Sequence, residues 1–177
     1  LIGTQDENGQ TNVAIFTSVV HIGANPPLLG FISRPHSVPR HTLENIIITK
    51  AFTINHVAEN FIAKAHQTAA KYSVSEFEAT GLSPVFLAGI NAPFVKEAAI
   101  KIGLSLVDII DIKINNTKMI IGKIEYVDLP KNRIAKDGKI NIETAQTVAI
   151  SGLDTYHKTI ELARFAYAKP DEILEKL

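Results

Sequence analysis

The sequence predicts a mainly β domain, an antiparallel barrel with a few appended helices. Runs rich in β-branched and aromatic residues outnumber the segments with helical spacing along the 177 residues. These runs follow one another through short turns and do not alternate with helices, an order that favours hairpins over a doubly wound parallel sheet. At this length we expect one domain with a substantial core, spanning residues 1–177.

The chain begins with strands joined by a turn. Residues 6–10, DENGQ, form a turn signal between two apolar stretches, so residues 1–5 and the run after the turn predict a hairpin. Residues 11–22, TNVAIFTSVVHI, predict one continuous strand, and the prolines of NPP end it. Residues 28–33 predict a short buried strand. The chain opens within its first strand, so we expect further residues before Leu1.

Helical spacing follows this third strand. Ser37 suits an N-cap and Pro39 suits a first helical turn. Leu43, Ile46 and Ile47 recur at the spacing of one helical face. These residues predict a helix that begins near Ser37.

A strand and two short helical segments come next. AFTINHV, residues 51–57, predicts a strand. In the segment after it, Phe61, Ile62 and Ala65 share one helical face. The run SEFEATGL predicts a helical turn that Gly81 ends.

The second half of the chain predicts a long hairpin. Residues 94–114 and 118–129 are β-type runs, and the Asn-Asn-Thr between them suits a tight turn because Asn tolerates a left-handed backbone. Residues 147–153 are expected to form the last strand. Residues 159–177 predict a helical C-terminal tail, in which Pro170 starts a second short helix.

The composition excludes several classes of site. The chain has no cysteine, which excludes disulfides, cysteine-ligated metals and thiol catalysis. Its 18 basic and 18 acidic residues balance, which argues against a nucleic-acid partner and against an anionic membrane surface. No apolar run is long enough to cross a bilayer, no signal peptide is visible, and the six histidines form no metal-binding pattern. We therefore expect a cytoplasmic protein with no metal, membrane or nucleic-acid partner.

Donors and positive charges gather where the third strand ends and the first helix begins, in SRPHSVPRHT. The first N–H groups of a helix lack intrahelical partners, and the helix dipole places partial positive charge there. Arg34, Arg40 and His41 add charge or donors, and Ser33 and Thr42 add hydroxyls. Two interpretations fit: a site for an anion such as a phosphate monoester, or a solvated loop before a capped helix.

Six short motifs stand in a particular order along residues 1–129. They are T-x-D-x-x-G-x-x-N at Thr4–Asn12, the hydroxyl residue Ser18 in the second strand, Pro-Pro at 26–27, T-x-x-N-I at Thr42–Ile46, F-T-I-N at Phe52–Asn55, and S-E-F-E-A-T-G-L at Ser75–Leu82. This order resembles that of the flavin reductase-like family, whose fold is the FMN-binding split barrel. The order is more specific than any one of the motifs.

The resemblance implies an antiparallel Greek-key split β-barrel that binds FMN noncovalently at a homodimer interface. Thr17 and Ser18 would then lie beside the isoalloxazine ring of the flavin. Ser33 and Arg34 would meet the ribityl chain and the phosphate.

The resemblance also implies contacts from the helix start and from the C-terminal part of the chain. Thr42, with Arg40 or His41, would complete the phosphate grip. Tyr156 and His157 would border the open face of the flavin, where a nicotinamide can stack. A plain surface loop is the other interpretation of these last two residues.

The sequence thus predicts an FMN-binding oxidoreductase of the flavin reductase type, with NADH or NADPH as transient reductant. It has no hydrolase nucleophile motif and no glycine-rich dinucleotide-binding motif, so the nicotinamide would lie transiently over the flavin. FMN would carry the redox chemistry, and the chain would supply orientation and a phosphate anchor. Two alternatives remain open: a flavoredoxin-like electron carrier with a partner protein, and a non-catalytic flavin-binding protein.

Overall fold

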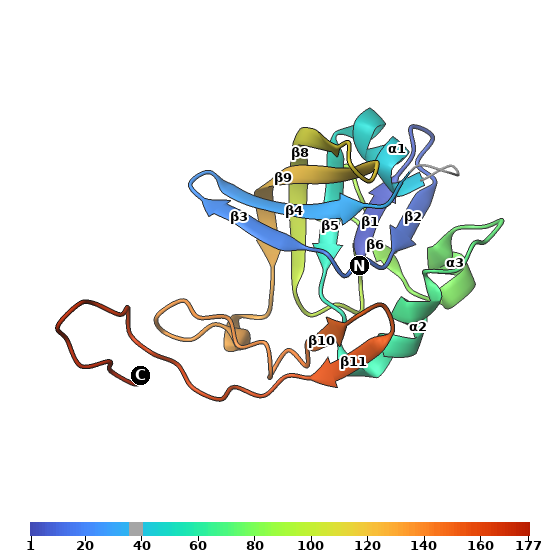
Figure 1. The fold of residues 1–177 in the computed structure, drawn as a ribbon. Helices are drawn as coiled ribbons and strands as arrows, with labels where there is room; N and C mark the ends of the chain where they lie inside the picture. The colour runs from blue at the N-terminus through green and yellow to red at the C-terminus, as the bar shows by residue number, and fades with distance from the viewer. Residues whose placement is uncertain (36–40) are drawn as a thin grey trace.

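The computed structural model of the protein describes residues 1–35 and 41–177 (Figure 1). Within these residues, the main feature is an antiparallel sheet of seven strands with three short α-helices beside it. None of the described helices is long and apolar enough to cross a membrane. The elements in chain order are β1 (Ile2–Gln5), β2 (Thr11–Ala14), β3 (Val20–Ala24), β4 (Pro27–Ser33), α1 (His41–Thr49), β5 (Ala51–Asn55), a 3-10 turn (Glu59–Phe61), α2 (Ile62–Gln67), α3 (Glu76–Thr80), β6 (Pro84–Val85), β7 (Phe94–Val95), β8 (Lys101–Ile112), β9 (Thr117–Asp128), a second 3-10 turn (Lys131–Arg133), β10 (Val148–Ser151) and β11 (Thr155–Lys158).

The seven-stranded sheet curls toward a barrel, because the connection between its two edges is short. The strand order is β2-β1-β5-β8-β9-β4-β3, so β2 and β3 lie at opposite edges, and residues 15–19 join them. The chain from Ala14 to Val20 can span at most about 22 Å. A flat sheet would separate these edges by about 29 Å, since neighbouring strands lie about 4.8 Å apart. The predicted mainly β, antiparallel barrel is therefore confirmed.

The single strand predicted for residues 11–22 is wrong, because residues 15–19 interrupt it between β2 and β3. Within the interruption, the Ser18 hydroxyl accepts a hydrogen bond from Ile32 N and donates to the Ile32 carbonyl, each at 3.2 Å. Side-chain hydrogen bonds thus replace backbone pairing at this point. The break allows the chain to cross from one edge of the sheet to the other.

An apolar cluster fills the inside of the curled sheet. Phe31 of β4 and Phe52 of β5 are fully buried, and their rings meet edge to face with centroids 5.5 Å apart. Phe16, from the connection between the edges, packs on Phe31 at 4.8 Å in the same way. Leu43 and Ile46 of α1 belong to this cluster, so α1 covers part of the barrel core.

A second apolar cluster attaches the other two helices. Phe61 and Ala65 from the α2 region and Phe77 of α3 are buried together with Val13 of β2. The helical face predicted around Phe61 and Ala65 is confirmed, although Ile62 is only partly buried. This cluster lies against β2, which places α2 and α3 at that side of the sheet (Figure 1).

The predicted long hairpin and the predicted end of a short helix at Gly81 are confirmed. The long hairpin forms between β8 and β9, and Asn116 in its turn has the left-handed φ of 56°. Its first strand begins at Lys101, because residues 94–95 form the separate strand β7. The short helix α3 begins at the cap Ser75, whose hydroxyl accepts from Phe77 N, and ends at Gly81 with φ 66°.

Helix α1 differs from its prediction in the face that it buries. The predicted cap Ser37 and the predicted Pro39 lie outside the described residues, and the described helix begins at His41. Ile47 is 44% exposed, so it does not share the buried face of Leu43 and Ile46. The buried face instead includes two polar residues that form hydrogen bonds with the sheet: Thr42 and Asn45.

The helical tail predicted for residues 159–177 is wrong. These residues contain no helix and run away from the sheet (Figure 1). A short amphipathic helix is stable only when its apolar face packs, and here Leu162 and Tyr167 are 90% exposed. The tail folds back on itself through backbone bonds, such as the one from Ala166 N to Glu175 O at 3.0 Å.

The predicted last strand is confirmed as β10, but one more strand follows it. β10 and β11 form a two-stranded hairpin apart from the main sheet. Backbone bonds tie this hairpin to the end of β5, as from Val148 N to Val57 O at 3.0 Å. The hairpin lies beside α2 (Figure 1), and the hollows of the molecule form around it.

Candidate functional site

An inner pocket of about 230 Å³ lies between the connection 15–19, the end of β5 and the β10–β11 hairpin. Its walls are mostly apolar, with a few hydroxyl, amide and imidazole groups. Ligand sites for drug-sized molecules measure about 300–1,000 Å³, so this pocket suits a flat part of a larger ligand. Its lining residues are Leu1, Ile15, Phe16, Thr17, Val19, Ile54, Asn55, His56, Val57, Thr147, Val148, Ile150 and Tyr156.

Two attachments shape the inner pocket. The hydrogen bonds from Ser18 to Ile32 hold the connection 15–19 against β4, and the neighbouring Thr17 lines the pocket. On the opposite side, the pairing of β10 with β11 sets Ile150 directly across from Tyr156, and both line the pocket. The connection 15–19 thus forms one wall of the inner pocket, and the β10–β11 hairpin forms the opposite wall.

Two polar side chains of the inner pocket have shifted pKa values. His56 Nδ1 lies 3.3 Å from Thr147 Oγ1. Burial lowers the pKa of His56 to about 4, so its imidazole is neutral at neutral pH. Burial, and after it the charge of Asp154, raises the pKa of Tyr156, so its phenol stays protonated there. The pocket therefore offers uncharged polar groups.

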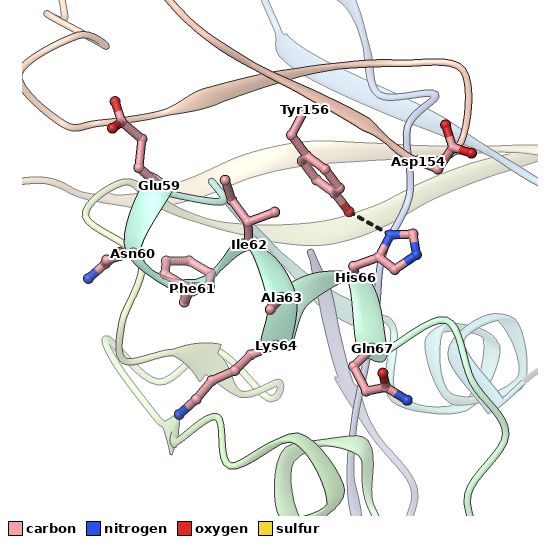
Figure 2. Close-up of a pocket in the computed structure, with 10 residues that line it drawn as sticks. All are labelled: Glu59, Asn60, Phe61, Ile62, Ala63, Lys64, His66, Gln67, Asp154 and Tyr156. Carbon is pink, nitrogen blue, oxygen red and sulfur yellow. Dashed lines mark hydrogen bonds between the residues drawn. The ribbon is translucent and has the colours of Figure 1, made fainter.

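A larger and more open hollow of about 760 Å³, the outer cleft, lies between α2 and β11 (Figure 2). Tyr156 lines both hollows. Its hydroxyl lies 3.0 Å from His66 Nδ1, and the two rings meet edge to face with centroids 5.8 Å apart. The residues that line the outer cleft are Glu59, Asn60, Phe61, Ile62, Ala63, Lys64, His66, Gln67, Asp154 and Tyr156.

Ser33 and Arg34 lie at the end of β4. They directly follow Ile32, whose backbone forms hydrogen bonds with the Ser18 hydroxyl. Ser33 is only 4% exposed. Arg34 is exposed and forms no ion pair with a described residue. A hydroxyl and a guanidinium side by side at the end of β4 form a corner with the chemistry to bind an anion. Arg40, also predicted here, lies outside the described residues.

Thr42 has a structural role under α1. Its hydroxyl and that of Thr4 lie 3.1 and 3.2 Å from the side-chain amide of Asn12. With the amide oxygen facing these hydroxyls, the amide nitrogen donates to Glu76 Oε2 at 3.1 Å. Asn45 Nδ2 donates to the same Thr4 hydroxyl at 3.2 Å. Asn12 is thus a buried cross-link rather than only a turn residue. A phosphate contact of Thr42, or of the exposed His41 beside it, stays a prediction.

The structure brings some of the predicted site residues together. Thr17 and Tyr156 line one pocket, as expected for residues beside the same ring. Ser18 lies next to Thr17, but its hydroxyl forms hydrogen bonds with the backbone of Ile32. His157 does not line the pocket, because successive strand residues face opposite ways; its Nε2 lies 2.8 Å from Ser151 Oγ.

Three residues of the two hollows carry no site signal in the sequence. His56 ends a predicted strand, a position that marks it only as a hydrogen-bonded residue. Thr147 and His66 stand in runs without a motif. His66 meets Tyr156 across 90 residues of chain, a contact that only the tertiary fold creates.

Together, the fold and the site define a small barrel protein with a mostly apolar inner pocket and with Ser33 and Arg34 at the end of β4. The chain belongs to the family of flavin reductase like domains, whose model matches residues 1–151. The family predicted from the motifs is therefore confirmed, and the match extends beyond the motifs into β10.

Solved structures share this fold. A split-barrel protein of Shewanella frigidimarina, proposed to be a flavin reductase, is 50% identical with a TM-score of 0.90, covering 94% of this chain and 84% of that one. Nitrilotriacetate monooxygenase component B of Bacillus cereus is 25% identical with a TM-score of 0.81, covering 90% and 82%. Flavoredoxin of Desulfovibrio vulgaris is 23% identical with a TM-score of 0.79, covering 97% and 88%, and this likeness concerns the fold alone.

Proposed function

We propose that the protein binds FMN and acts as a flavin reductase-like oxidoreductase, with NADH or NADPH as the hydride donor. The observation that carries this proposal is the buried Ser33 beside Arg34, which forms no ion pair with a described residue, in a chain of the flavin reductase like family. A phosphate monoester satisfies both donors, and riboflavin lacks that group.

The donor set fits FMN in two parts. The inner pocket has the size and the apolar lining for a flat ring system, with Thr17 on one wall and Tyr156 on the other. The neutral His56 and Thr147 can hydrogen-bond polar ring atoms without placing a charge in the pocket. Ser33 and Arg34 hold the phosphate in this proposal, with Arg40, His41 and Thr42 as the further predicted contacts.

The chain's own residues would bind and orient, and they would keep water from the ring. FMN, when bound, supplies the two-electron chemistry and takes hydride from reduced nicotinamide. Direct transfer needs the two rings about 3–3.5 Å apart, so one face of the flavin must stay open. Tyr156, between the inner pocket and the open outer cleft, borders that face in the proposal.

We further propose a cytoplasmic homodimer. Reduced nicotinamide nucleotides are available in the cytoplasm. The inner pocket of one chain is smaller than a site for a whole flavin nucleotide, which is consistent with a second subunit completing it. The alternative, a flavoredoxin-like electron carrier that serves a partner protein, needs the same FMN grip but no nicotinamide site. A non-catalytic flavin-binding protein needs only the residues that bind FMN.

One experiment separates the reductase from both alternatives. The purified protein, loaded with FMN, is mixed anaerobically with NADH or NADPH in a stopped-flow instrument, and the bleaching of flavin absorbance is followed. We expect bleaching faster than that of free FMN. If neither nicotinamide achieves this while dithionite or a reduced ferredoxin does, the electron-carrier function takes its place. If no added FMN is retained, the flavin proposal itself fails.

A further inference from the structure

Tyr156 is the wall that the inner pocket and the outer cleft share. It is the aromatic residue common to the linings of both hollows. On the strand β11 it lies across from Ile150, which lines the inner pocket only. Tyr156 therefore lies where the two hollows adjoin.

His66 holds this ring from the side of α2. The 3.0 Å hydrogen bond joins the tip of the tyrosine to the imidazole, as Figure 2 shows. Neighbouring side chains of the cleft are engaged elsewhere: Lys64 Nζ donates to Gly81 O and Gln67 Nε2 donates to Tyr72 Oη, each at 2.7 Å. Among the described residues, His66 is the hydrogen-bond partner of the Tyr156 hydroxyl.

The bond ties β11 to α2, and the ion pair of Lys158 with Glu59, at 3.3 Å, joins β11 to the 3-10 turn just before that helix. Tyr156 belongs to a two-stranded hairpin outside the main sheet, and His66 belongs to a helix of six residues. A side-chain hydrogen bond contributes about 0.5–1.5 kcal/mol, which sets how much of the time the ring keeps this orientation. Without the bond, the ring can turn toward either hollow and change the width of the passage.

We propose that His66 is a positioning residue that acts through Tyr156 and controls how the nicotinamide donor enters from the outer cleft to the flavin. This inference rests on the proposed function and adds to it a residue and a route. The flavin is held by the phosphate corner and the apolar walls, so the hydrogen bond should affect the second substrate and leave flavin affinity nearly unchanged.

The test compares three variants of the full chain. His66→Leu removes the bond and keeps a good helix former, whereas His66→Asn places an amide where Nδ1 lies and can restore it. His157→Leu is the matched control, because it changes the histidine next to Tyr156 whose side chain bonds Ser151 instead. Thermal unfolding of each variant verifies that it is folded. Flavin binding is measured by fluorescence quenching, and KM and kcat for the nicotinamide are measured anaerobically.

For His66→Leu we expect a KM for the nicotinamide raised about two- to tenfold, the range for one lost hydrogen bond, with flavin Kd changed less than twofold. His66→Asn and His157→Leu should remain within about twofold of the wild type in both quantities. The double variant of His66→Leu with Tyr156→Phe should be no worse than the worse single variant, because both remove the same bond.

A readout without turnover completes the test. Nitrogen-15 NMR of the histidine rings should show the His66 resonances moving in Tyr156→Phe and on addition of FMN to the wild type, while those of His157 stay in place. If the wild type binds and reduces flavin but His66→Leu equals it, or flavin leaves His66 unmoved, this inference alone fails. If the wild type binds no flavin, or no nicotinamide reduces it, the proposed function fails and the inference with it.

Discussion

At the scale of single residues, Arg34 carries a charge that no described acidic group neutralises. We predict that Arg34→Ala weakens FMN binding about tenfold to a hundredfold, since a charge-assisted hydrogen bond contributes about 1.5–3 kcal/mol. Riboflavin binding should change less than twofold, because riboflavin has no phosphate. Titration of both ligands by fluorescence quenching gives the two constants.

The control for this change is Lys136→Ala, which removes an exposed cation that lines neither hollow. Arg40→Ala, measured in the same way, tests the predicted contact that lies outside the described residues. Equal weakening of FMN and riboflavin by Arg34→Ala would falsify the assignment of the phosphate to this corner.

The buried His56 makes stability depend on pH. Its pKa of about 4 in the folded protein lies below the ordinary value of 6.5, so between these values the unfolded state binds more protons. The folded state therefore loses stability as the pH falls from about 6.5 to 4. Each unit of pKa difference corresponds to about 1.4 kcal/mol, which limits the loss to about 3 kcal/mol.

We predict that His56→Gln, which cannot titrate, loses about 1–3 kcal/mol less than the wild type between pH 7 and pH 4. Urea unfolding at a series of pH values measures the difference. His21→Gln, at an exposed position on β3, serves as the control and should follow the wild type. Parallel curves for His56→Gln and the wild type would contradict the assignment.

The roles of the predicted site residues stay predictions, and the structure shows only where these residues lie. Thr17 and Tyr156 were predicted on the resemblance, and they line one pocket. His157 was predicted with Tyr156, but strand alternation turns it away. His66 could not be predicted, because its role depends on packing a helix beside a hairpin 90 residues later.

At the scale of elements, the core depends on a close approach of β9 to Phe52. A side chain at Gly122 would overlap the ring of Phe52, which is fully buried. We predict that Gly122→Ala destabilises the protein by about 1–3 kcal/mol through overpacking. The free energy of unfolding in urea is the measurement.

Gly23→Ala is the matched control for this element. A methyl group at Gly23 would have its nearest neighbour at the ordinary contact distance of 3.8 Å, the carbonyl oxygen of Pro26. We expect a change within about 0.5 kcal/mol. If both variants lost the same free energy, the packing against Phe52 would not be the cause.

Elements whose signals are local were predicted correctly. The turn at Asn116 and the end of α3 at Gly81 depend on residues within a few positions, and both are confirmed. The break after Ala14 was missed because the partner of Ser18 is the backbone of Ile32, in another strand. The C-terminal tail was predicted as helix, although its apolar side chains have no surface of the same chain to cover.

At the scale of the whole molecule, we predict a homodimer that the tail helps to hold. None of residues 159–177 is buried, yet several are large and apolar, with Ile173 98% exposed. Such surface favours a partner, and obligate dimers bury about 2,000 Å² or more. Sedimentation should show a species of about twice the 19.3 kDa of one chain.

Deleting residues 159–177 should leave the fold intact, because the tail contributes nothing buried, and should shift the protein toward the monomer. Circular dichroism verifies the fold, and sedimentation at micromolar concentration gives the oligomeric state. A full-length chain that is monomeric with FMN still bound would contradict both the dimer and a site completed by a second subunit.

The strand order also governs how the chain is made. β8 and β9 lie between two groups of strands from the first third of the chain: β2, β1 and β5 on one side, and β4 with β3 on the other. On a ribosome, both groups emerge long before the hairpin that joins them, so β5 and β4 each present an open edge to other nascent chains. These long-range pairings also make folding slow. The open edges of β5 and β4 can pair fully with β8 and β9 only after Asp128, the last residue of β9, has left the exit tunnel.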